Sequence, residues 1–273
     1  MAPAFPRHLV KTALPLALVL ALALGGCKSL GDVTGSIGNE SLPQSTESLR
    51  VWAEEWGKKY EADPASKLAA LNYARALKAL GQINQAAAVL QTAVLRHPTD
   101  KELITAYGKA LADAGRLQEA VPVLASAHTP ERPNWSVYSA QGSVADQMGN
   151  HAQAQEFYKS ALEIMPGEPG VLSNLGLSYA LSRDLGRAEE TLRQAADSPR
   201  ADARVRQNLA LVLALQGKFD QAEQLSRRDL SPEEARANVA AIRQMIAQSN
   251  TWREIQKLGG GKGKPGGPVP VAG

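Results

Sequence analysis

Residues 67–100, KLAALNYARALKALGQINQAAAVLQTAVLRHPTD, decide the fold, because the chain repeats their pattern every 34 residues. Five copies follow one another without an insertion and begin at Lys67, Lys101, Trp135, Pro169 and Ala203. Small residues recur at the eighth position of each copy: Ala74, Gly108, Gly142, Gly176 and Ala210. Alanine recurs at the twentieth: Ala86, Ala120, Ala154, Ala188 and Ala222. A constant period of this length predicts one structural unit stacked several times.

Each copy reads as two antiparallel helices joined by a tight turn. Glycine stands at the fifteenth position as Gly81, Gly115, Gly149 and Gly217, and only the fourth copy differs, with Arg183. A glycine just past a helix end adopts the left-handed backbone at little cost. Proline removes a donor and disfavours the preceding helical turn, so one near the end of each copy is expected to stop the second helix. These prolines are Pro98, Pro133, Pro166 and Pro199.

The small positions let neighbouring helices approach closely, and larger apolar residues fill the remaining space. The twenty-seventh position adds Ala93, Ala127, Ala161 and Ala195 to the small set. The expected space-filling residues are Leu90, Leu124, Tyr158 and Leu192 at position 24, with Leu77, Leu111, Tyr179 and Leu213 at position 11. A plain alanine-rich helical bundle is the alternative, but it does not require the same positions to stay small at a fixed interval.

This period and these positions resemble the tetratricopeptide repeat. The resemblance implies an all-α fold, a right-handed α-solenoid of helix-turn-helix repeats, with the first helix of each pair lining a concave surface. The repeats span 67–230, divided as 67–100, 101–134, 135–168, 169–202 and 203–230.

The flanks of the array read as helices that close it. A helix is expected over 42–61, before Pro64, as part of a leading partial repeat assigned to 47–66; its Trp52 and Trp56 serve either as core anchors or as a recognition patch. At the other end Ser231 and Glu234 form a capping box. It begins a C-terminal capping helix over 231–258, whose apolar stripe is Ala235, Val239, Ile242 and Ile246. The Gly/Pro/Lys tail at 259–273 is expected to be disordered.

The first 26 residues have the layout of a secretory signal peptide: Arg7 and Lys11, then an apolar segment over 13–24. Counted as a helix, the segment over 12–26 measures about 22 Å, too short for the roughly 30 Å hydrocarbon core. Leu24, Gly25, Gly26 and Cys27 resemble the lipobox of bacterial lipoproteins. This resemblance implies a diacylglycerol and an N-acyl chain on Cys27, the membrane anchor. The alternative for this single cysteine is a free thiol.

After such processing, residues 27–46 form a small, polar tether. By resemblance to lipoprotein sorting, Lys28 favours the outer membrane, with the protein facing the periplasm. Removal of residues 1–26 takes away two basic residues and no acidic one, so the formal charge of +3 falls to +1. A nearly neutral chain lacks the dense basic face of nucleic-acid-binding proteins, so no nucleic-acid partner is expected.

No pattern in the sequence indicates catalysis or metal binding. The four histidines His8, His97, His128 and His151 are scattered and have no metal-ligand spacing. No glycine-rich phosphate loop follows a strand pattern. We therefore expect no enzyme, no catalytic residue, no metal, no cofactor and no small-molecule substrate, although helical repeats can in principle carry a hidden active site.

Groove-facing residues follow from the repeat, whose first helix turns positions 2, 5, 6, 9 and 12 inward. Position 6 gives Asn72, Asn174 and Asn208, whose amides can pair with a peptide backbone, although asparagine is also common at this position regardless of ligand. The basic candidates are Arg75, Lys78, Lys109 and Arg204. They favour acidic or carboxylate-bearing protein segments, unless they are only solvated surface charges.

The lipobox, the tether, the repeats and the stretches RRDLSPEEA at 227–235 and NVAAIRQMI at 238–246 together resemble the TadD family of Flp pilus (tight adherence) assembly lipoproteins. The resemblance implies a scaffold that assists assembly or localisation of the pilus secretin, with the secretin or other Tad assembly proteins as partners. The alternative of another class is a lipoprotein regulator or adaptor of periplasmic cell-wall synthesis.

Overall fold

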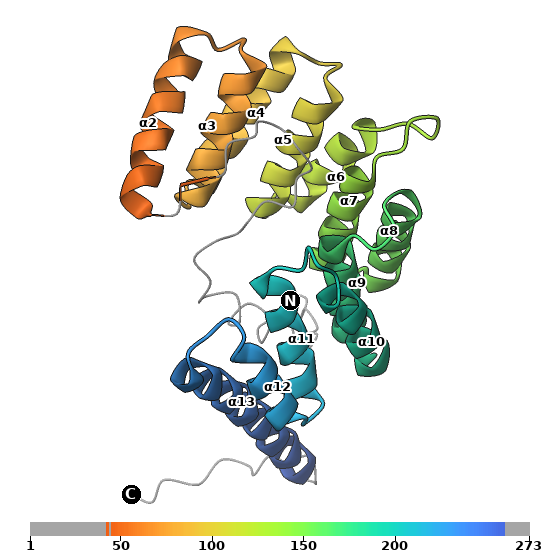
Figure 1. Ribbon diagram of the computed structural model, residues 1–273. Coiled ribbons are helices and arrows are strands. Elements are labelled where there is room, and N and C mark those ends of the chain that lie inside the picture. The colour runs from red at the N-terminus through yellow and green to blue at the C-terminus, as the bar shows by residue number, and fades with distance from the viewer. Residues whose placement is uncertain (1–41, 44, 260–273) are drawn as a thin grey trace, which may run out of the picture. The chain divides into compact units, whose positions relative to one another are not determined.

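The computed structural model describes residues 42–43 and 45–259 (Figure 1). The expected signal peptide, Cys27, most of the tether and nearly all of the C-terminal tail lie outside these residues. The chain divides into two compact units, one ending at Ala201 and the other beginning at Asp202.

The first unit is a row of helices in which each packs mainly on the next along the chain (Figure 1). Its helices are α2 (Thr46–Ala62), α3 (Lys67–Ala79), α4 (Ile83–Arg96), α5 (Lys101–Asp113), α6 (Leu117–Ser126), α7 (Trp135–Gln147), α8 (His151–Ile164), α9 (Pro169–Leu181) and α10 (Leu185–Ala196). Among the described residues, the β-structure is one isolated bridge between Thr129 and Arg132. The all-α solenoid predicted from the repeats is confirmed.

The second unit contains the fifth helix pair and the C-terminal helix: α11 (Ala203–Leu215), α12 (Phe219–Ser226) and α13 (Pro232–Gly259). The capping box forms, since Ser231 Oγ accepts the Glu234 N–H at 3.3 Å and the Glu234 carboxylate accepts the Ser231 N–H at 3.0 Å. Helix α13 packs on α11 and α12, with Ala235 and Val239 buried. The Arg243 guanidinium lies over the Phe219 ring, 5.1 Å from its centroid. Helix α13 therefore covers the last pair, as a cap requires.

The turn inside each helix pair is a left-handed helix end. The four predicted glycines have φ between +71° and +81°. At the first turn, the Gln82 N–H donates to the Leu77 carbonyl at 2.8 Å and the Gly81 N–H to Lys78 at 2.9 Å. This pair of bonds defines a Schellman motif, and the other turns repeat it. In the fourth copy Arg183 takes the same conformation, with φ of +67°.

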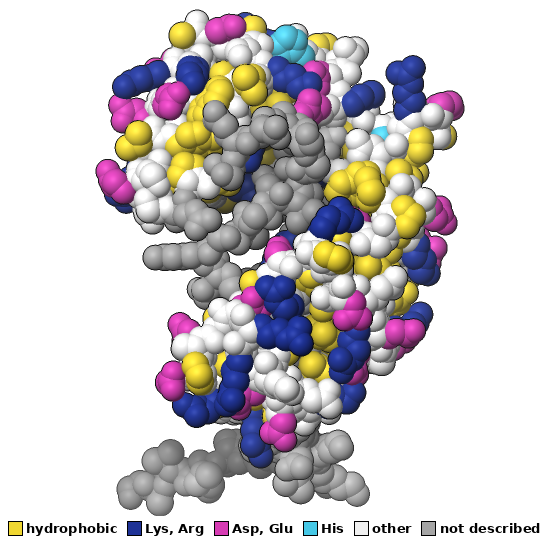
Figure 2. All heavy atoms as spheres, in the orientation of Figure 1, with side chains coloured by type: hydrophobic (Ala, Val, Ile, Leu, Met, Phe, Trp, Pro, Cys, Tyr) yellow, Lys and Arg dark blue, Asp and Glu magenta, His cyan; other side chains and the backbone are white. Residues whose placement is uncertain are grey.

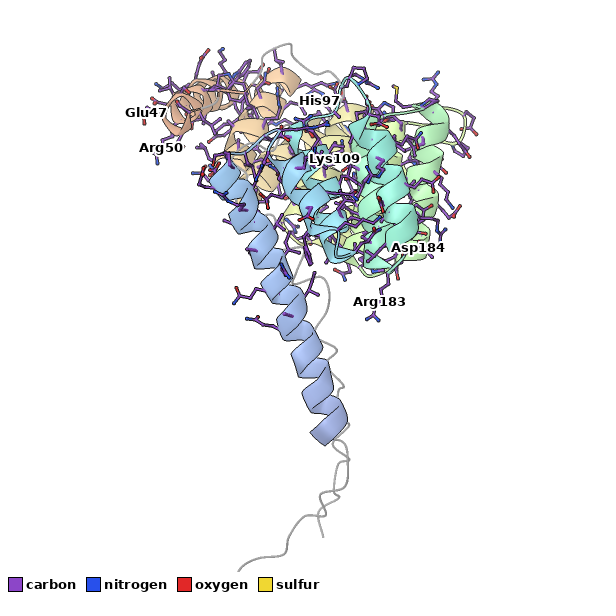
Figure 3. The ribbon with its side chains drawn as sticks, turned by 60° about the horizontal axis from the view of Figure 1, so that its bottom comes forward. Glu47, Arg50, His97, Lys109, Arg183 and Asp184 are labelled. Atoms are coloured by element: carbon purple, nitrogen blue, oxygen red, sulfur yellow. The ribbon has the colours of Figure 1, made fainter. Side chains whose placement is uncertain are left out.

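Replacing Arg183 by glycine is expected to stabilise the protein by about 1 kcal/mol, because glycine relieves the left-handed strain of a side-chain-bearing residue. The Arg183 side chain is exposed and extends away from the turn (Figure 3). Urea unfolding measures the change. Arg183→Ala is the matched control, since it removes the guanidinium but keeps the strain. An equal gain in both variants would assign the effect to the charge instead.

The glycines at position 8 lie against the large residues at position 24. A Cβ on Gly108 or Gly176 would come within 2.6 Å of the Leu124 or Leu192 side chain. A Cβ on Gly142 would come equally close to the Tyr158 ring. Leu124 and Leu192 are fully buried and Tyr158 is 2% exposed. Close approach through small residues therefore occurs as the repeat pattern predicts.

A polar cluster joins the third and fourth copies. Asp146, at the end of α7, accepts a hydrogen bond from Ser178 Oγ in α9 at 2.8 Å. His151 Nδ1, at the start of α8, lies 2.9 Å from the same carboxylate oxygen, and the Tyr158 hydroxyl also bonds to Asp146. Burial raises the pKa of Asp146, although the hydrogen bonds from His151, Ser178 and Tyr158 act in the opposite direction.

Two sequence-based expectations about helix ends are wrong. Helix α6 ends at Ser126, well before Pro133. Pro130 keeps Thr129 out of the helical region, so the helix could not have continued to Pro133, but it does not by itself explain an end at Ser126. The leading helix begins at Thr46 rather than Leu42, since the Ser45 side chain accepts the Ser48 N–H and caps it there.

Candidate functional site

The first unit contains a groove of about 460 Å³ between α3, α4, α5 and the start of α7. Its floor is apolar and consists of Leu71, Ala74, Ile83, Ala86 and Leu90. Ala106 and Ala110 extend the apolar lining along α5, and Trp135 stands where α7 begins. The first helices of three successive copies thus contribute to one hollow, as expected for the inner face of this repeat.

Charged side chains surround this floor. Four cations line the groove: Arg75, Lys78, Lys101 and Lys109. Two carboxylates, Glu102 and Asp113, also line it. The formal charge of the lining residues is therefore positive by two.

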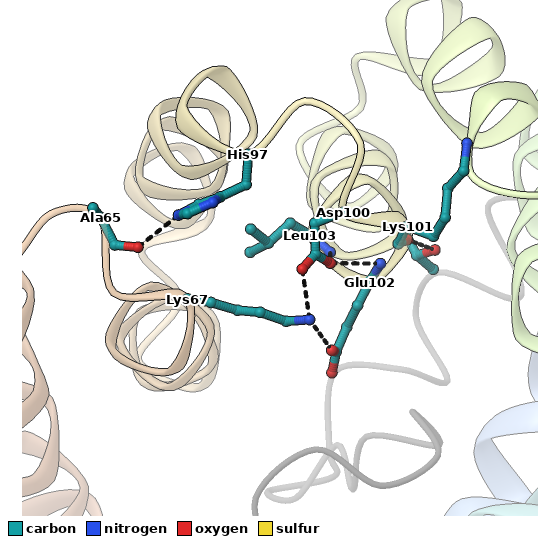
Figure 4. Close-up of polar contacts among 8 residues, drawn as sticks. Ala65, Lys67, His97, Asp100, Lys101, Glu102 and Leu103 are labelled. Atoms are coloured by element: carbon teal, nitrogen blue, oxygen red, sulfur yellow. Dashed lines mark hydrogen bonds and ion pairs between the residues drawn. The ribbon is translucent and has the colours of Figure 1, made fainter.

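Both groove carboxylates have a lysine partner. Asp113 lies 2.9 Å from Lys78 Nζ. Glu102 pairs with Lys67, which also donates to Asp100 at 2.7 Å (Figure 4). Burial opposes the charge on Lys67, but the bonds to Asp100 and Glu102 outweigh it, so the pKa of Lys67 is raised. The acidic residues of the groove are thus occupied by ion pairs within the fold.

The same region is held by a contact between successive turns. His97 Nε2 donates to the Ala65 carbonyl at 2.7 Å, which ties the end of α4 to the turn before α3 (Figure 4). Lys101 Nζ donates to the Ser126 carbonyl at 2.6 Å. These bonds fix the N-terminal ends of α3 and α5, the two helices that carry the cations of the groove.

Arg75 is positioned by residues on two helices. Its Nη1 donates to the Asn72 amide oxygen at 3.1 Å, and its guanidinium lies 5.9 Å from the centroid of the Trp52 ring. Asn72 is only 4% exposed and does not line the groove. Its amide therefore orients Arg75, whatever else it contacts.

Lys109 connects two copies. Its Nζ donates to Ser136 Oγ at 2.7 Å, from the middle of α5 to the first turn of α7. Lys109 is half-buried, so the alkyl part of its side chain packs along the groove while the ammonium lies near Trp135 and Ser136.

The remaining candidates lie elsewhere. Asn174 is on α9, and its amide donates to Ser139 Oγ at 3.5 Å. Arg204 and Asn208 are on α11 in the second unit, where Arg204 lies 4.0 Å from Asp202. The structure therefore brings Arg75, Lys78 and Lys109 together in one groove, with Asn72 behind them, and places the other three outside it.

Among the lining residues absent from the sequence-based candidates are Lys101, Glu102, Asp113 and Trp135. Glu102 occupies an inward position, the second of its copy, but its charge is opposite to that of the basic candidates. Lys101 and Trp135 are the first residues of their copies, where the helix start turns them toward the groove. Asp113 follows an inward position by one residue, and only its pairing with Lys78 indicates where it points.

Figure 2 shows basic and acidic side chains mixed over the visible face of the described residues. Within the same residues there is no group of three or more histidine, cysteine, aspartate or glutamate side chains that could hold a metal ion. Nor is any helix of this part of the chain long and apolar enough to cross a membrane.

Comparison with known proteins identifies the repeat. The tetratricopeptide repeat family model matches residues 57–110 and 147–207. No curated protein matched the chain.

Three solved structures illustrate the shared fold. The type IV pilus biogenesis factor PilW is 19% identical, over 74% of this chain and 91% of that chain, with a TM-score of 0.56. PilF of Pseudomonas aeruginosa is 22% identical, over 69% and 91%, with a TM-score of 0.51. A thermophilic repeat protein of Thermus thermophilus is 21% identical, over 65% and 98%, with a TM-score of 0.58. At these identities the likeness shows the fold alone.

Proteins built from such repeats use their concave surfaces as scaffolds for binding other proteins. The repeat period, the left-handed turn in each helix pair, the family match and the solved structures agree. The helix pairs of this chain have the tetratricopeptide-repeat fold, and those of the first unit stack into an α-solenoid.

Proposed function

We propose that this protein is a lipid-anchored scaffold of the outer membrane that faces the periplasm and binds a protein partner in its groove. The partner is the secretin, or another assembly protein, of a Flp (Tad) pilus, and the scaffold assists its assembly or localisation. The observation that carries the scaffold role is the groove shared by α3, α4, α5 and α7.

The groove suits a protein segment better than a small substrate. It is bounded by successive helices rather than closed, and it combines an apolar floor with charged sides. Peptide recognition commonly uses this combination, in which pockets take side chains and polar groups fix their orientation.

The membrane part of the proposal rests on sequence. Leu24, Gly25, Gly26 and Cys27 resemble a lipobox, and a diacylglycerol with an N-acyl chain on Cys27 supplies a far stronger anchor than one chain. A polar segment of the chain then separates the anchor from the first helix, so the groove can reach partners near the membrane.

The pilus part rests on the C-terminal stretches that resemble the TadD family. In the structure they build the cap of the second unit. Arg206 on α11 holds Asp229 through two hydrogen bonds, of 2.8 and 2.5 Å, just before the capping box at Ser231. PilW is a type IV pilus biogenesis factor with the same fold, which is consistent with the proposal at the level of fold.

Crosslinking in intact cells tests the proposed function. A photoreactive residue in place of Thr105, which lines the groove and is not one of its cations, is expected to capture the secretin or another Tad assembly protein. The same residue in place of Arg183, which extends away from the turn between α9 and α10, is the matched control and is expected to capture much less of it. Capture of a cell-wall synthase instead would contradict the pilus role and support the regulator of cell-wall synthesis.

The anchor is tested in the same cells. Cys27→Ser is expected to move the protein from the membrane fraction to the soluble periplasmic fraction, because the residue that carries the lipid is lost. Unfolding of the purified repeats should be unchanged. A Cys27→Ser protein that remains membrane-bound and labelled by lipid would refute the lipoprotein assignment.

A further inference from the structure

We infer that the groove between α3, α4, α5 and the start of α7 selects an acidic protein segment that also carries large apolar side chains. This inference rests on the proposed scaffold function and specifies the chemistry of the bound segment. It concerns the surface formed by the floor Leu71, Ala74, Ile83, Ala86 and Leu90 and by the cations Arg75, Lys78, Lys101 and Lys109.

The charge of the lining residues favours an acidic segment. Cations outnumber carboxylates by four to two. Asp113 is already paired with Lys78, and Glu102 with Lys67, which lies outside the lining set. A basic segment would have to compete with these lysines for the same carboxylates. An acidic segment adds negative charge where the lining has an excess of positive charge. This improves the electrostatic complementarity between segment and groove and increases the rate at which the two associate.

Two of the cations are held in place before a partner arrives. Lys109 donates to the neutral hydroxyl of Ser136, and Arg75 donates to the neutral amide oxygen of Asn72. Asn72 is buried and therefore fixed, so the guanidinium loses little side-chain freedom when it binds a carboxylate. The groove thus presents two oriented cations, one on α3 and one on α5.

The apolar floor of the groove explains why a negative charge alone does not make a segment the preferred ligand. Leu71, Ala74, Ile83, Ala86 and Leu90 form an apolar surface that a purely polar segment would leave partly hydrated. Burial of an aliphatic or aromatic side chain there gains free energy in proportion to the apolar area removed from water. The favoured segment therefore combines carboxylates with leucine-like side chains, which distinguishes it from nucleic acid.

Fluorescence anisotropy with the purified full-length mature protein tests this inference. The probe is a labelled synthetic peptide in which glutamates and leucines alternate. One comparison peptide has glutamine in place of glutamate, and another has alanine in place of leucine. Each replacement is expected to weaken binding by about tenfold or more, given the strength of hydrogen bonds to charged groups and of apolar burial. Added salt is expected to weaken the glutamate peptide and to leave the glutamine peptide almost unchanged.

A matched pair of variants locates the effect. Lys109→Gln is expected to reduce binding of the glutamate peptide about tenfold, since a charged hydrogen bond to the ligand is lost. The thermal midpoint is expected to fall by a few degrees at most, since the bond to Ser136 is lost but the core is untouched. Lys159→Gln removes an exposed lysine of α8, outside the groove, and is expected to bind as the unaltered protein does.

Three outcomes would overturn the inference: equal binding of the glutamate and glutamine peptides, equal loss in the two lysine variants, or complete displacement of the peptide by single-stranded DNA at a similar concentration. Any of them would leave the proposed function standing if the crosslinker at Thr105 still captured the pilus protein. Failure of that capture, with the peptide preferences intact, would refute the pilus role alone.

Discussion

Asp146→Ala is expected to cost about 3 kcal/mol of unfolding free energy, because it removes the acceptor on which a buried polar cluster depends. Ser178 is fully buried and Tyr158 is 2% exposed, so neither hydroxyl can turn to water once the carboxylate is gone. His151 loses its partner as well. Guanidinium unfolding of the purified protein measures the loss.

Asp146→Asn is the control, since its amide oxygen can still accept the hydrogen bond from Ser178. It is expected to cost less than half as much as the alanine variant. An alanine variant as stable as the asparagine variant would show that the cluster contributes little.

The same pair predicts a dependence on pH. Burial raises the pKa of Asp146 in the folded protein above its unfolded value, despite the opposing hydrogen bonds. A carboxyl of this kind contributes stability below its unfolded pKa and loses that contribution as pH rises through the folded pKa. The unaltered protein should therefore lose stability as pH rises from strongly acidic values through the folded pKa of Asp146. Asp146→Asn has no carboxyl to titrate there, so its stability relative to the unaltered protein should improve over the same pH interval. A relative stability that falls with rising pH would contradict the direction of the shift.

Gly142→Ala is expected to destabilise the protein by about 2 kcal/mol through overpacking. The new methyl group would lie 2.6 Å from Tyr158 Cε1, and Tyr158 has no room to move because it is buried and bonded to Asp146. The intrinsic helix preference of alanine over glycine, up to about 1 kcal/mol, offsets only part of this cost. Thermal and denaturant unfolding give the net change.

Gly186→Ala serves as the comparison for that variant. Gly186 lies in the first turn of α10, and a Cβ there meets its nearest neighbour, Asp184 Oδ1, at 3.7 Å, which is ordinary contact. Its replacement is expected to be neutral or slightly stabilising. If both glycine variants changed stability equally, backbone preference rather than the contact with Tyr158 would be responsible.

The repeated part of the fold could be predicted from the sequence because each prediction depended on residues within a single 34-residue copy. Gly81 and its counterparts mark left-handed turns, and the small residues at position 8 lie against the large ones at position 24. These features follow from spacing within one copy. The exception at Arg183 was also visible in the sequence, although only the backbone shows that arginine adopts the strained conformation.

The groove and the polar cluster were less predictable because they depend on how separate copies pack. Arg75, Lys78 and Lys109 were identified from inward positions, but the pairing of Lys78 with Asp113 requires the relative rotation of α3 and α5. The contact of Asp146 with Ser178 joins residues 32 positions apart. The early end of α6 was not predicted either, since the helix ends at Ser126 and Pro133 lies seven residues further along the chain.

The row of helices in the first unit has a consequence for how such a protein can change. Each helix packs mainly on the next, and the 34-residue register has no insertion. Duplication of one whole copy would therefore preserve every contact type and lengthen the inner face by one step, whereas gain or loss of a single residue would break the match between position 8 and position 24. The length of the inner face can thus change during evolution by one helix pair at a time, while the core contacts within each pair stay the same.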